Sequence, residues 1–167
     1  MKSNSVNLEG DTATPCGSPL PSVGASITHV VAGALFDARG RVLIAQRPPG
    51  KHMEGGWEFP GGKLDPGEEP LAGLKRELRE ELGVEVHDAE PLIAFEHAYA
   101  DRRVLLELWL VTRFTGEARP LERQPLRWVD LEMLDHIGLL EADAPMAPAL
   151  REARRKDRRP DAADSEQ

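Results

Sequence analysis

The sequence predicts an α/β domain in which a β-sheet packs against α-helices. Two patterns carry this prediction: short strand-like runs that recur along the chain, and leucines at helical spacing near its centre. Strands mixed with two or three helices favour a sheet layered on helices. At 167 residues the chain is long enough for one domain with a genuine hydrophobic core.

The two ends of the chain differ in composition from its middle. Residues 1–25 are rich in Ser, Pro, Gly and Thr, which predicts a disordered tail. Residues 157–167 are predicted to form a flexible, solvated tail. The basic cluster that begins at Arg154 could touch nucleic acid, but solvation is the simpler interpretation. The domain is therefore expected at residues 26–156, and no internal repeat is visible.

The first elements of the domain are two strands, near 27–36 and 41–47, joined by the turn Asp37-Ala38-Arg39-Gly40. The remaining predicted elements are, in order, a helix near 70–82, strands near 92–99, 103–114 and 126–129, and helices near 131–136 and 144–156. This mixture of elements is what predicts the α/β class.

The helix near 70–82 has the clearest signals. Its leucines recur at helical spacing, so that one stripe should face a core: Leu71, Leu74, Leu78 and Leu82. Pro70 suits the first helical turn, and Gly83 suits the position after the last turn. Gly73 lies one turn before Glu77 and leaves room for a loop or a ligand to approach.

The same helix carries Glu77, Glu80 and Glu81 at i, i+3 and i+4, beside the leucine stripe. Like charges at these spacings repel by roughly 0.2–0.5 kcal/mol per pair. A divalent cation reverses the sign of that interaction, and Mg²⁺ and Mn²⁺ prefer carboxylate oxygens. The three carboxylates therefore predict a metal site. The alternative is a solvated acidic face with Lys75 and Arg76 as partners.

The full pattern resembles the sequence box of the Nudix hydrolases, G-x5-E-x7-R-E-U-x-E-E-x-G-U, in which U is a bulky apolar residue. Every specified position is filled, by Gly62, Glu68, Arg76, Glu77, Leu78, Glu80, Glu81, Gly83 and Val84. The resemblance implies the Nudix fold, a mixed β-sheet sandwiched between α-helices. It also implies a hydrolase that uses Mg²⁺, with Mn²⁺ as an alternative.

The resemblance also implies roles for the residues around the box. Metal ligands are expected at Gly61 (through its carbonyl), Glu77, Glu80, Glu81 and Glu122. Glu68 and Arg76 are expected to pair and to brace the loop on the helix, which orients the ligands. Glu77 is the first candidate for the general base, and Glu80 and Glu122 are the alternatives. From its polar, Pro-flanked loop alone, Glu122 would be a solvent residue.

Residues 44–150 resemble the MutT branch of this family, which hydrolyses oxidised guanine triphosphates such as 8-oxo-dGTP to a monophosphate and pyrophosphate. The implied nucleotide site consists of Arg47, His52, Glu58, Phe59, Arg102 and Asp143. Arg47 and His52 match positions that contact phosphates, and a guanidinium suits phosphate oxygens. The backbone of Phe59 matches a base contact, although its side chain could equally belong to the core.

The identity of the base depends on Asp143, because MutT-type enzymes commonly have Asn there. An Asn amide can accept from N7–H of 8-oxoguanine and donate to O6. A protonated Asp143 would mimic Asn, whereas an ionised one would face the lone pairs of O6. Related pyrimidine triphosphate pyrophosphatases also carry Asp, so CTP or 5-substituted dCTP is the alternative. A catalytically silent nucleotide-binding module is a further alternative, which the complete box disfavours.

Composition limits the partners and the location. The net charge of −8 disfavours nucleic acid polymers, and it would repel a nucleoside triphosphate unless a metal and local cations intervene. There is no long apolar run, so no membrane association is expected, and the N-terminus lacks the apolar segment of a secretory signal. The single cysteine, Cys16, suits a reducing cytoplasm. The sequence does not determine the oligomeric state.

Overall fold

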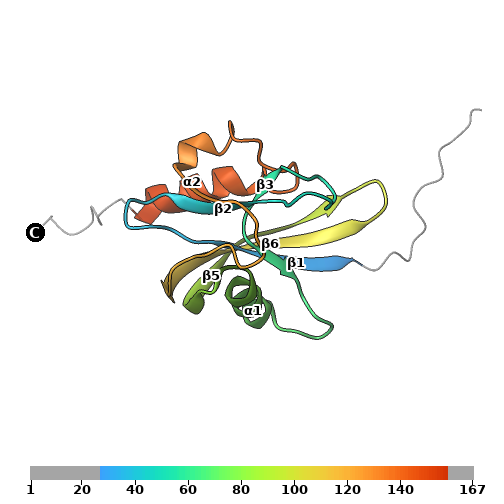
Figure 1. Ribbon diagram of the computed structural model, residues 1–167, viewed down its shortest axis with the longest axis horizontal. Coiled ribbons are helices and arrows are strands. Elements are labelled where there is room, and N and C mark those ends of the chain that lie inside the picture. Colours follow the sequence, from blue (N-terminus) through green and yellow to red (C-terminus); the bar gives the residue numbers. More distant parts are fainter. Residues whose placement is uncertain (1–26, 158–167) are drawn as a thin grey trace, which may run out of the picture.

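Figure 1 shows the computed structural model, which describes residues 27–157. Helix α1 (Pro70–Leu82) lies on one side of the β-strands and helix α2 (Met146–Asp157) lies on the other side. The predictions for the two tails and for Cys16 concern residues outside this range. Neither helix in the described range is both long enough and apolar enough to cross a membrane.

The larger of the two sheets has the strand order β4-β1-β6-β5. Its strands are β1 (Thr28–Ala34), β4 (Gly61–Lys63), β5 (Glu85–Ala98) and β6 (Arg103–Thr115). Strand β1 pairs in parallel with β6, with Thr28 opposite Val104. Strands β4 and β5 pair antiparallel with β1 and β6, respectively. The sheet is therefore mixed, as the sequence predicts.

The smaller sheet has the order β3-β2-β7 and is antiparallel throughout. Its strands are β2 (Val42–Gln46), β3 (Trp57–Glu58) and β7 (Leu126–Val129). A single 3-10 turn, η1 (Leu131–Met133), connects β7 toward α2. Because β3 and β4 are separated only by Phe59 and Pro60, the chain passes from the smaller sheet to the larger one at this point.

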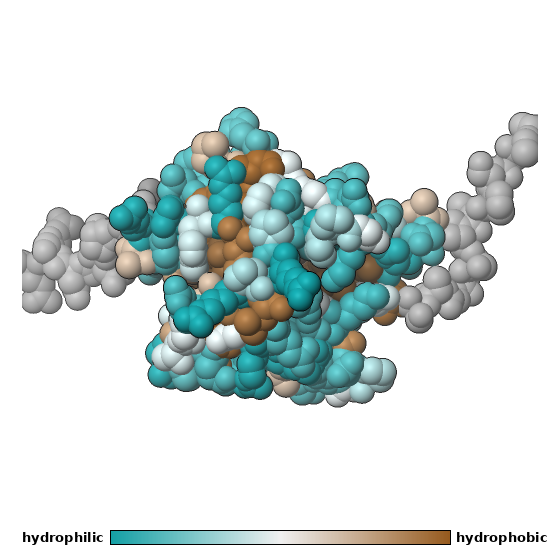
Figure 2. Space-filling view, viewed as in Figure 1, coloured by the Kyte–Doolittle hydropathy of each residue, from teal (hydrophilic) through white to brown (hydrophobic). Residues whose placement is uncertain are grey.

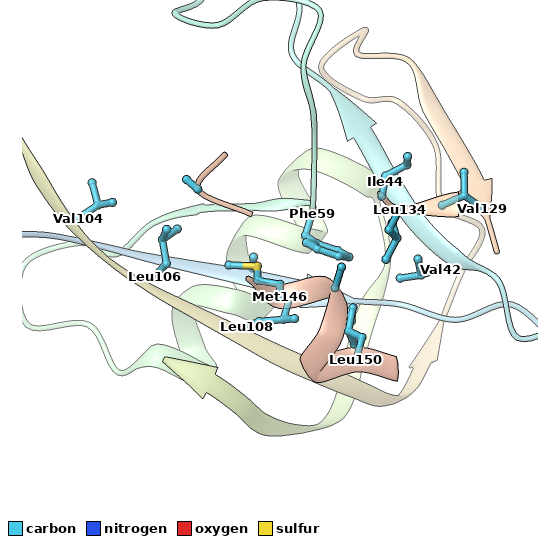
Figure 3. Packing of buried hydrophobic residues seen from close by; sticks show 14 residues of the cluster. Val42, Ile44, Phe59, Val104, Leu106, Leu108, Val129, Leu134, Met146 and Leu150 are labelled. Atoms are coloured by element: carbon cyan, nitrogen blue, oxygen red, sulfur yellow. The ribbon is translucent and has the colours of Figure 1, made fainter. Parts of the chain in front are cut away.

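Alternate residues of β1 face different helices, which divides the core into two clusters. Val31 packs in one cluster with three buried leucines of α1: Leu74, Leu78 and Leu82. Ala32 packs in the other cluster with Phe59 and with Met146 and Leu150 of α2 (Figure 3). The leucine stripe predicted for α1 is thus confirmed. On the face shown in Figure 2, polar side chains break the apolar surface into small patches.

Helix α1 has the ends that its sequence predicts. Pro70 occupies the start of the helix, where a missing N–H leaves no hydrogen bond unmade. Gly83 follows the last turn with a φ of 71°, and its N–H donates to the carbonyl of Arg79 at 2.9 Å. This left-handed cap stops the helix directly after Leu82.

Four elements differ from the prediction. Strands β3 and β4 were not predicted, because two and three residues are too few to show a period. Strand β5 begins at Glu85 rather than near 92. Its first half was not predicted, because the strand lies at the sheet edge and many of its side chains are polar and exposed. Pro91 lies within it next to a register shift, which an edge strand tolerates. The helix predicted near 131–136 is the 3-10 turn η1 followed by further turns.

Candidate active site

The glycines of β4 lie directly against the acidic face of α1. The N–H of Gly61 donates to Oε2 of Glu81 at 2.9 Å. A Cβ atom on Gly62 would lie 2.3 Å from the carboxyl carbon of Glu77, and one on Gly61 would lie 2.1 Å from the carbonyl oxygen of Val31. Only glycine fits at Gly61, because a side chain there would separate β4 from the backbone of β1, and a side chain at Gly62 would displace the carboxylate of Glu77.

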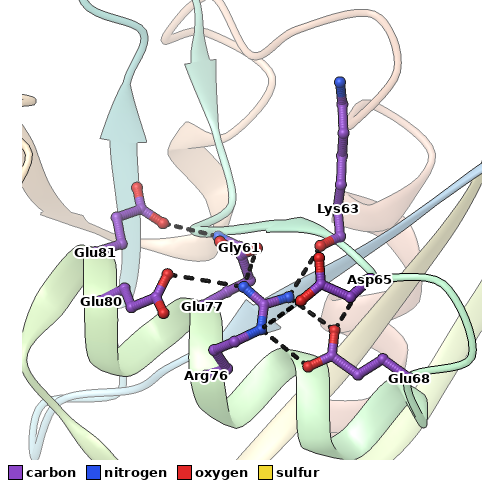
Figure 4. Close-up of polar contacts among 8 residues, drawn as sticks. All are labelled: Gly61, Lys63, Asp65, Glu68, Arg76, Glu77, Glu80 and Glu81. Carbon is purple, nitrogen blue, oxygen red and sulfur yellow. Dashed lines mark hydrogen bonds and ion pairs between the residues drawn. The ribbon is translucent and has the colours of Figure 1, made fainter.

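Arg76 ties the loop before α1 to the helix (Figure 4). Its Nε and Nη2 donate to the two carboxylate oxygens of Glu68 at 2.9 and 2.7 Å. Its Nη1 donates to Oε1 of Glu77 at 2.8 Å, and Nη2 also reaches the carbonyl of Lys63 at 3.1 Å. The hydrogen bonds from Arg76 lower the pKa of Glu68 to about 2. The pairing of Glu68 with Arg76 expected from the sequence is therefore confirmed.

The same loop packs on Gly73. A Cβ atom there would lie 2.1 Å from Cδ2 of Leu64 and 2.9 Å from Oε2 of Glu68. The prediction that Gly73 leaves room for a loop is thus confirmed. A larger residue would push Glu68 away from the helix and would disturb its hydrogen bonds to Arg76.

Glu81 has surroundings of a different kind. The pKa of Glu81 is raised to about 7, mainly by burial and also by the nearby charges of Glu58 and Glu122, while the N–H of Gly61 acts in the opposite direction. Gln124 donates from Nε2 to the backbone carbonyl of Glu81 at 3.1 Å and to its Oε1 at 3.3 Å. Glu81 is held by these neutral donors, and no ion pair with it occurs in the described part of the chain.

A cavity of about 200 Å³ lies between these elements, and its lining carries a large excess of negative charge. The lining residues are Ala45, Gln46, Pro48, Lys51, Glu58, Gly61, Gly62, Glu77, Glu81, Glu122 and Gln124. Nζ of Lys51 lies 3.8 Å from Oε2 of Glu122, and both side chains are more than half exposed. Four carboxylates with one exposed lysine form a donor set that suits a hard divalent cation.

Glu80 is placed apart from this lining. Its side chain is 61% exposed, and Oε2 lies 3.7 Å from Nη1 of Arg76. Within residues 27–157, no three His, Cys, Asp or Glu side chains are gathered closely enough to hold a metal ion as they stand. The structure thus brings Glu77 and Glu81 to one cavity, and Glu80 would have to leave Arg76 in order to join them.

A second buried carboxylate, Asp143, lies near Glu58 and Arg47. Asp143 is 6% exposed, and the backbone N–H of Phe59 donates to it. The pKa of Asp143 is raised to about 8, mainly by burial and also by the charge of Glu58, against the effects of the Phe59 N–H and of Arg47. This direction favours the protonated form of the carboxyl group. The side chain of Phe59 belongs to the core, while its backbone faces Asp143.

Of the other predicted nucleotide-site residues, Arg47 and Glu58 lie near this carboxyl group, while His52 and Arg102 contact Tyr99. Arg47 donates to Oε2 of Glu58 at 2.8 Å and to the carbonyl of His52 at 2.9 Å. The ring of His52 meets the edge of Tyr99 at 6.1 Å between centroids, and the guanidinium of Arg102 lies 4.7 Å from the centre of the Tyr99 ring. The tip of the β5–β6 hairpin is thereby placed beside the loop that carries His52.

Two residues in these surroundings were not selected as site residues from the sequence. No local sequence pattern marks Tyr99 as a contact for Arg102 and His52. Gln124 sits in a polar loop next to Glu122, where its amide looks like ordinary surface. Its burial becomes visible only when the loop is placed against α1.

A larger open cavity of about 640 Å³ lies elsewhere, between η1 and α2. Arginines dominate its lining, but Arg151 donates to the carbonyl of Leu131 at 3.0 Å and to Asp135 at 2.7 Å. Arg154 pairs with Asp157 at 3.0 Å. These guanidinium groups are already paired, so the acidic cavity is the better candidate for a reaction site.

Comparisons with known proteins identify the family of the chain. A family model described as the NUDIX domain matches residues 31–148. The chain is 45% identical over 89 residues to an 8-oxo-dGTP diphosphatase of Proteus vulgaris, which covers 53% of this chain and 80% of that protein. It is 38% identical over 130 residues to a CTP pyrophosphohydrolase of Escherichia coli K12, which covers 76% and 96%. A solved structure from work on MutT of Aliivibrio salmonicida and Vibrio cholerae superposes with a TM-score of 0.66 and 31% identity, covering 76% of this chain and 99% of that one.

Proposed function

Because the chain belongs to the Nudix family and is a pyrophosphohydrolase of the MutT type, we propose that it converts 8-oxo-dGTP to the monophosphate and pyrophosphate with Mg²⁺. The observation that carries the proposal is the acidic cavity between β4 and α1. Burial, with a smaller contribution from the charges of Glu58 and Glu122, raises the pKa of Glu81, so a charged carboxylate is unfavourable at this place in the free protein. Charged carboxylates become favourable there when they bind cations that also neutralise the phosphates of the substrate.

The proposed metal ligands are Glu77, Glu80, Glu81, Glu122 and the carbonyl of Gly61. A bound Mg²⁺ supplies charge neutralisation of the phosphates and a lower pKa for a coordinated water. The chain itself orients the ligands: Arg76 holds Glu77, while Gly61 and Gln124 hold Glu81. Glu77 remains our first candidate for the base that takes the proton of the attacking water, with Glu80 and Glu122 as alternatives.

Arg47 and His52 are proposed to contact the phosphates. Nε of Arg47 donates to Glu58, and one Nη donates to the carbonyl of His52. These two hydrogen bonds fix the plane of the guanidinium group. A guanidinium held in this way presents its remaining N–H groups in one direction, which suits phosphate oxygens. The net charge of −8 makes such local cations important, since the protein as a whole repels the substrate.

The preference for an oxidised guanine rests on Asp143. A carboxyl group with a pKa of about 8 offers one O–H donor and one acceptor at neutral pH. This is the pattern of the Asn amide expected from the family, and it complements N7–H and O6 of 8-oxoguanine. Ordinary dGTP has no hydrogen on N7, so it would leave the acceptor of Asp143 unpaired.

A pyrimidine triphosphate such as CTP or 5-substituted dCTP is the second candidate. The observation that favours it is also Asp143, because related pyrimidine pyrophosphatases carry Asp at this place and one matched relative is named a CTP pyrophosphohydrolase. The N4 amino group of cytosine could donate a hydrogen bond to an ionised Asp143. The two candidates therefore differ in the protonation state that they require of this carboxyl.

The decisive experiment measures kcat/KM for 8-oxo-dGTP, dGTP, CTP and 5-hydroxy-dCTP at fixed Mg²⁺, with the unsubstituted protein and with Asp143→Asn and Asp143→Ala. We expect 8-oxo-dGTP hydrolysis by the unsubstituted protein to fall between pH 6 and 9, as Asp143 loses its proton. Asp143→Asn should preserve or improve this hydrolysis and should not show that fall. We expect kcat/KM of Asp143→Ala to fall by an amount that corresponds to about 1–3 kcal/mol of transition-state stabilisation. Weaker hydrolysis by Asp143→Asn together with a preference for CTP would establish the second candidate.

A chelator provides the matched control for catalysis. Release of pyrophosphate that stops with EDTA and returns with Mg²⁺ is expected. Replacement by Mn²⁺ in the same assay tests the alternative metal.

We also propose that the enzyme acts on the free nucleotide in the cytoplasm, without a nucleic acid polymer or a membrane as partner.

A further inference from the structure

Gln124 combines nearly complete burial with an unpaired polar atom. Its side chain is 3% exposed, and Nε2 donates to two oxygens of Glu81, the backbone carbonyl at 3.1 Å and Oε1 at 3.3 Å. Within the described part of the chain, Oε1 has no hydrogen-bond partner and is closed off from solvent. A buried acceptor left unpaired in this way costs about 1–3 kcal/mol.

The orientation of the amide is fixed by its surroundings. If the amide were turned over, its oxygen would face two acceptor oxygens of Glu81, and the nitrogen would lose both hydrogen bonds. The unpaired Oε1 is therefore a consequence of the two bonds that Nε2 makes. An apolar side chain of similar length would avoid this cost, so the contact with Glu81 is what explains a glutamine here.

The contact completes a clamp on the carboxylate of Glu81. Oε2 accepts from the N–H of Gly61, which belongs to the larger sheet, and Oε1 accepts from Gln124, in the loop that leads to β7 of the smaller sheet. The loop is itself anchored, because the N–H of Gln46 donates to the carbonyl of Pro125 at 2.9 Å. Donors from both sheets thus converge on one carboxylate of α1.

We propose that Gln124 is a positioning residue that fixes the carboxylate of Glu81 for cation binding, and that it does so at a cost in stability. The inference rests on the proposed function, because Gln124 acts through a proposed metal ligand. A glutamine that served packing alone would stabilise the fold. The proposal requires the opposite: loss of the amide should weaken cation binding without lowering the stability of the protein.

The test substitutes Gln124→Met, which keeps length and burial but removes both the donor and the unpaired acceptor. We expect calorimetric titration with Mn²⁺ alone to show roughly 10-fold weaker binding, as for other residues that orient metal ligands. The thermal midpoint of the metal-free protein should stay the same or rise. Arg123→Lys, in the same loop and exposed, is the control and should leave Mn²⁺ binding unchanged.

A double-mutant cycle separates action through Glu81 from a general disturbance of the loop. In the Glu81→Gln background, adding Gln124→Met should change Mn²⁺ binding by less than about 2-fold, because the carboxylate that Gln124 positions is already lost. An equal effect in both backgrounds would overturn the proposal. A lower thermal midpoint for Gln124→Met, with binding reduced in proportion, would overturn it as well, because it would mark a structural role.

The outcomes also distinguish this inference from the proposed function. If the unsubstituted protein binds Mn²⁺ and Gln124→Met binds it equally well, the inference alone is overturned. If the unsubstituted protein binds no Mn²⁺, or if Glu81→Gln binds it as well as the unsubstituted protein, then the metal site falls and the inference falls with it.

Discussion

Glu68, in the loop just before α1, and Glu81, in the last turn of α1, have opposite surroundings. Glu68 accepts two hydrogen bonds from Arg76, and its pKa is lowered to about 2. Glu81 lies in the cavity with neutral donors and with other carboxylates, and its pKa is raised to about 7. The paired carboxylate shapes the loop, whereas the unpaired one is left for a ligand of opposite charge.

Asp143 belongs with Glu81 in this comparison. Both are buried without a dedicated cation, and both have a raised pKa. In the folded protein each holds a proton that the unfolded chain has already released at the same pH. The contribution of these two groups to the stability of the metal-free protein therefore decreases as the pH rises from about 4 toward 8. The region around Arg76 contributes with the opposite sign, and its contribution is lost in acid.

The largest expected effect tests one proposed metal ligand from each region, Glu81 in the cavity and Glu80 beside Arg76. Glu81→Gln and Glu80→Gln each keep the size of the side chain but remove an anionic oxygen. We expect kcat to fall by at least about 100-fold in each variant with the fold intact, since metal catalysis supplies several kcal/mol. Steady-state kinetics over a Mg²⁺ titration checks this. Near-normal turnover at saturating Mg²⁺ would remove the residue concerned from the metal site.

A smaller effect is expected when the paired region is weakened. Arg76→Lys keeps the charge but cannot hold both oxygens of Glu68 and one of Glu77 together. We expect kcat/KM to fall about 10-fold and the thermal midpoint to drop, because the loop loses its brace. If activity falls while the loop stays as protected from proteolysis as before, the role of Arg76 is not to brace the loop.

The third prediction concerns stability rather than activity. Asp143→Asn removes a carboxyl group whose folded pKa of about 8 exceeds its unfolded value of 3.8. The metal-free variant should be more stable than the unsubstituted protein at pH 8–9, by roughly 3–8 °C in thermal midpoint, and equal to it near pH 4. Thermal unfolding across that pH range is the measurement. A difference that did not depend on pH would show that Asp143 is ionised throughout.

The smallest effect sharpens the comparison from outside both regions. Arg79 pairs with Glu85 at 2.7 and 2.8 Å, but both side chains are about half exposed. We expect Arg79→Ala to shift the thermal midpoint by less than about 2 °C and kcat/KM by less than about 2-fold. A large effect would mean that charge pairing on α1 matters regardless of its distance from the cavity, and the distinction drawn above would lose its meaning.

The elements that could be predicted from the sequence are those with local signals. Helix α1 has a leucine stripe, a proline at its start and a glycine after its end, and each of these acts within a few residues. Strands β3 and β4 have no such signals, because their short segments become strands only through pairing with β2 and β1. The start of β5 was missed for a related reason, since an edge strand needs few apolar residues.

The candidate site divides in the same way. The box identifies Glu77, Glu80 and Glu81 by spacing along the chain, but their different surroundings come from contacts with distant residues. Glu80 turns to the solvent side of Arg76, and Glu81 is enclosed by Gln124, which is 43 positions away in the sequence. Burial and the resulting pKa depend on such long-range packing, so no local pattern could have separated these three carboxylates.

The parallel pairing of β1 with β6 has a consequence for how the protein is made. Thr28 to Ala34 cannot find their partners on β6 until residue 110 has left the ribosome, although β1 is the first strand to be synthesised. Until then β4, which brings Gly61 to the helix, has half of its sheet missing. Contacts so far apart in the chain form slowly. A nascent fragment that ends between Val84 and the start of β6 therefore contains the whole box and still lacks the strand that completes the sheet around β1.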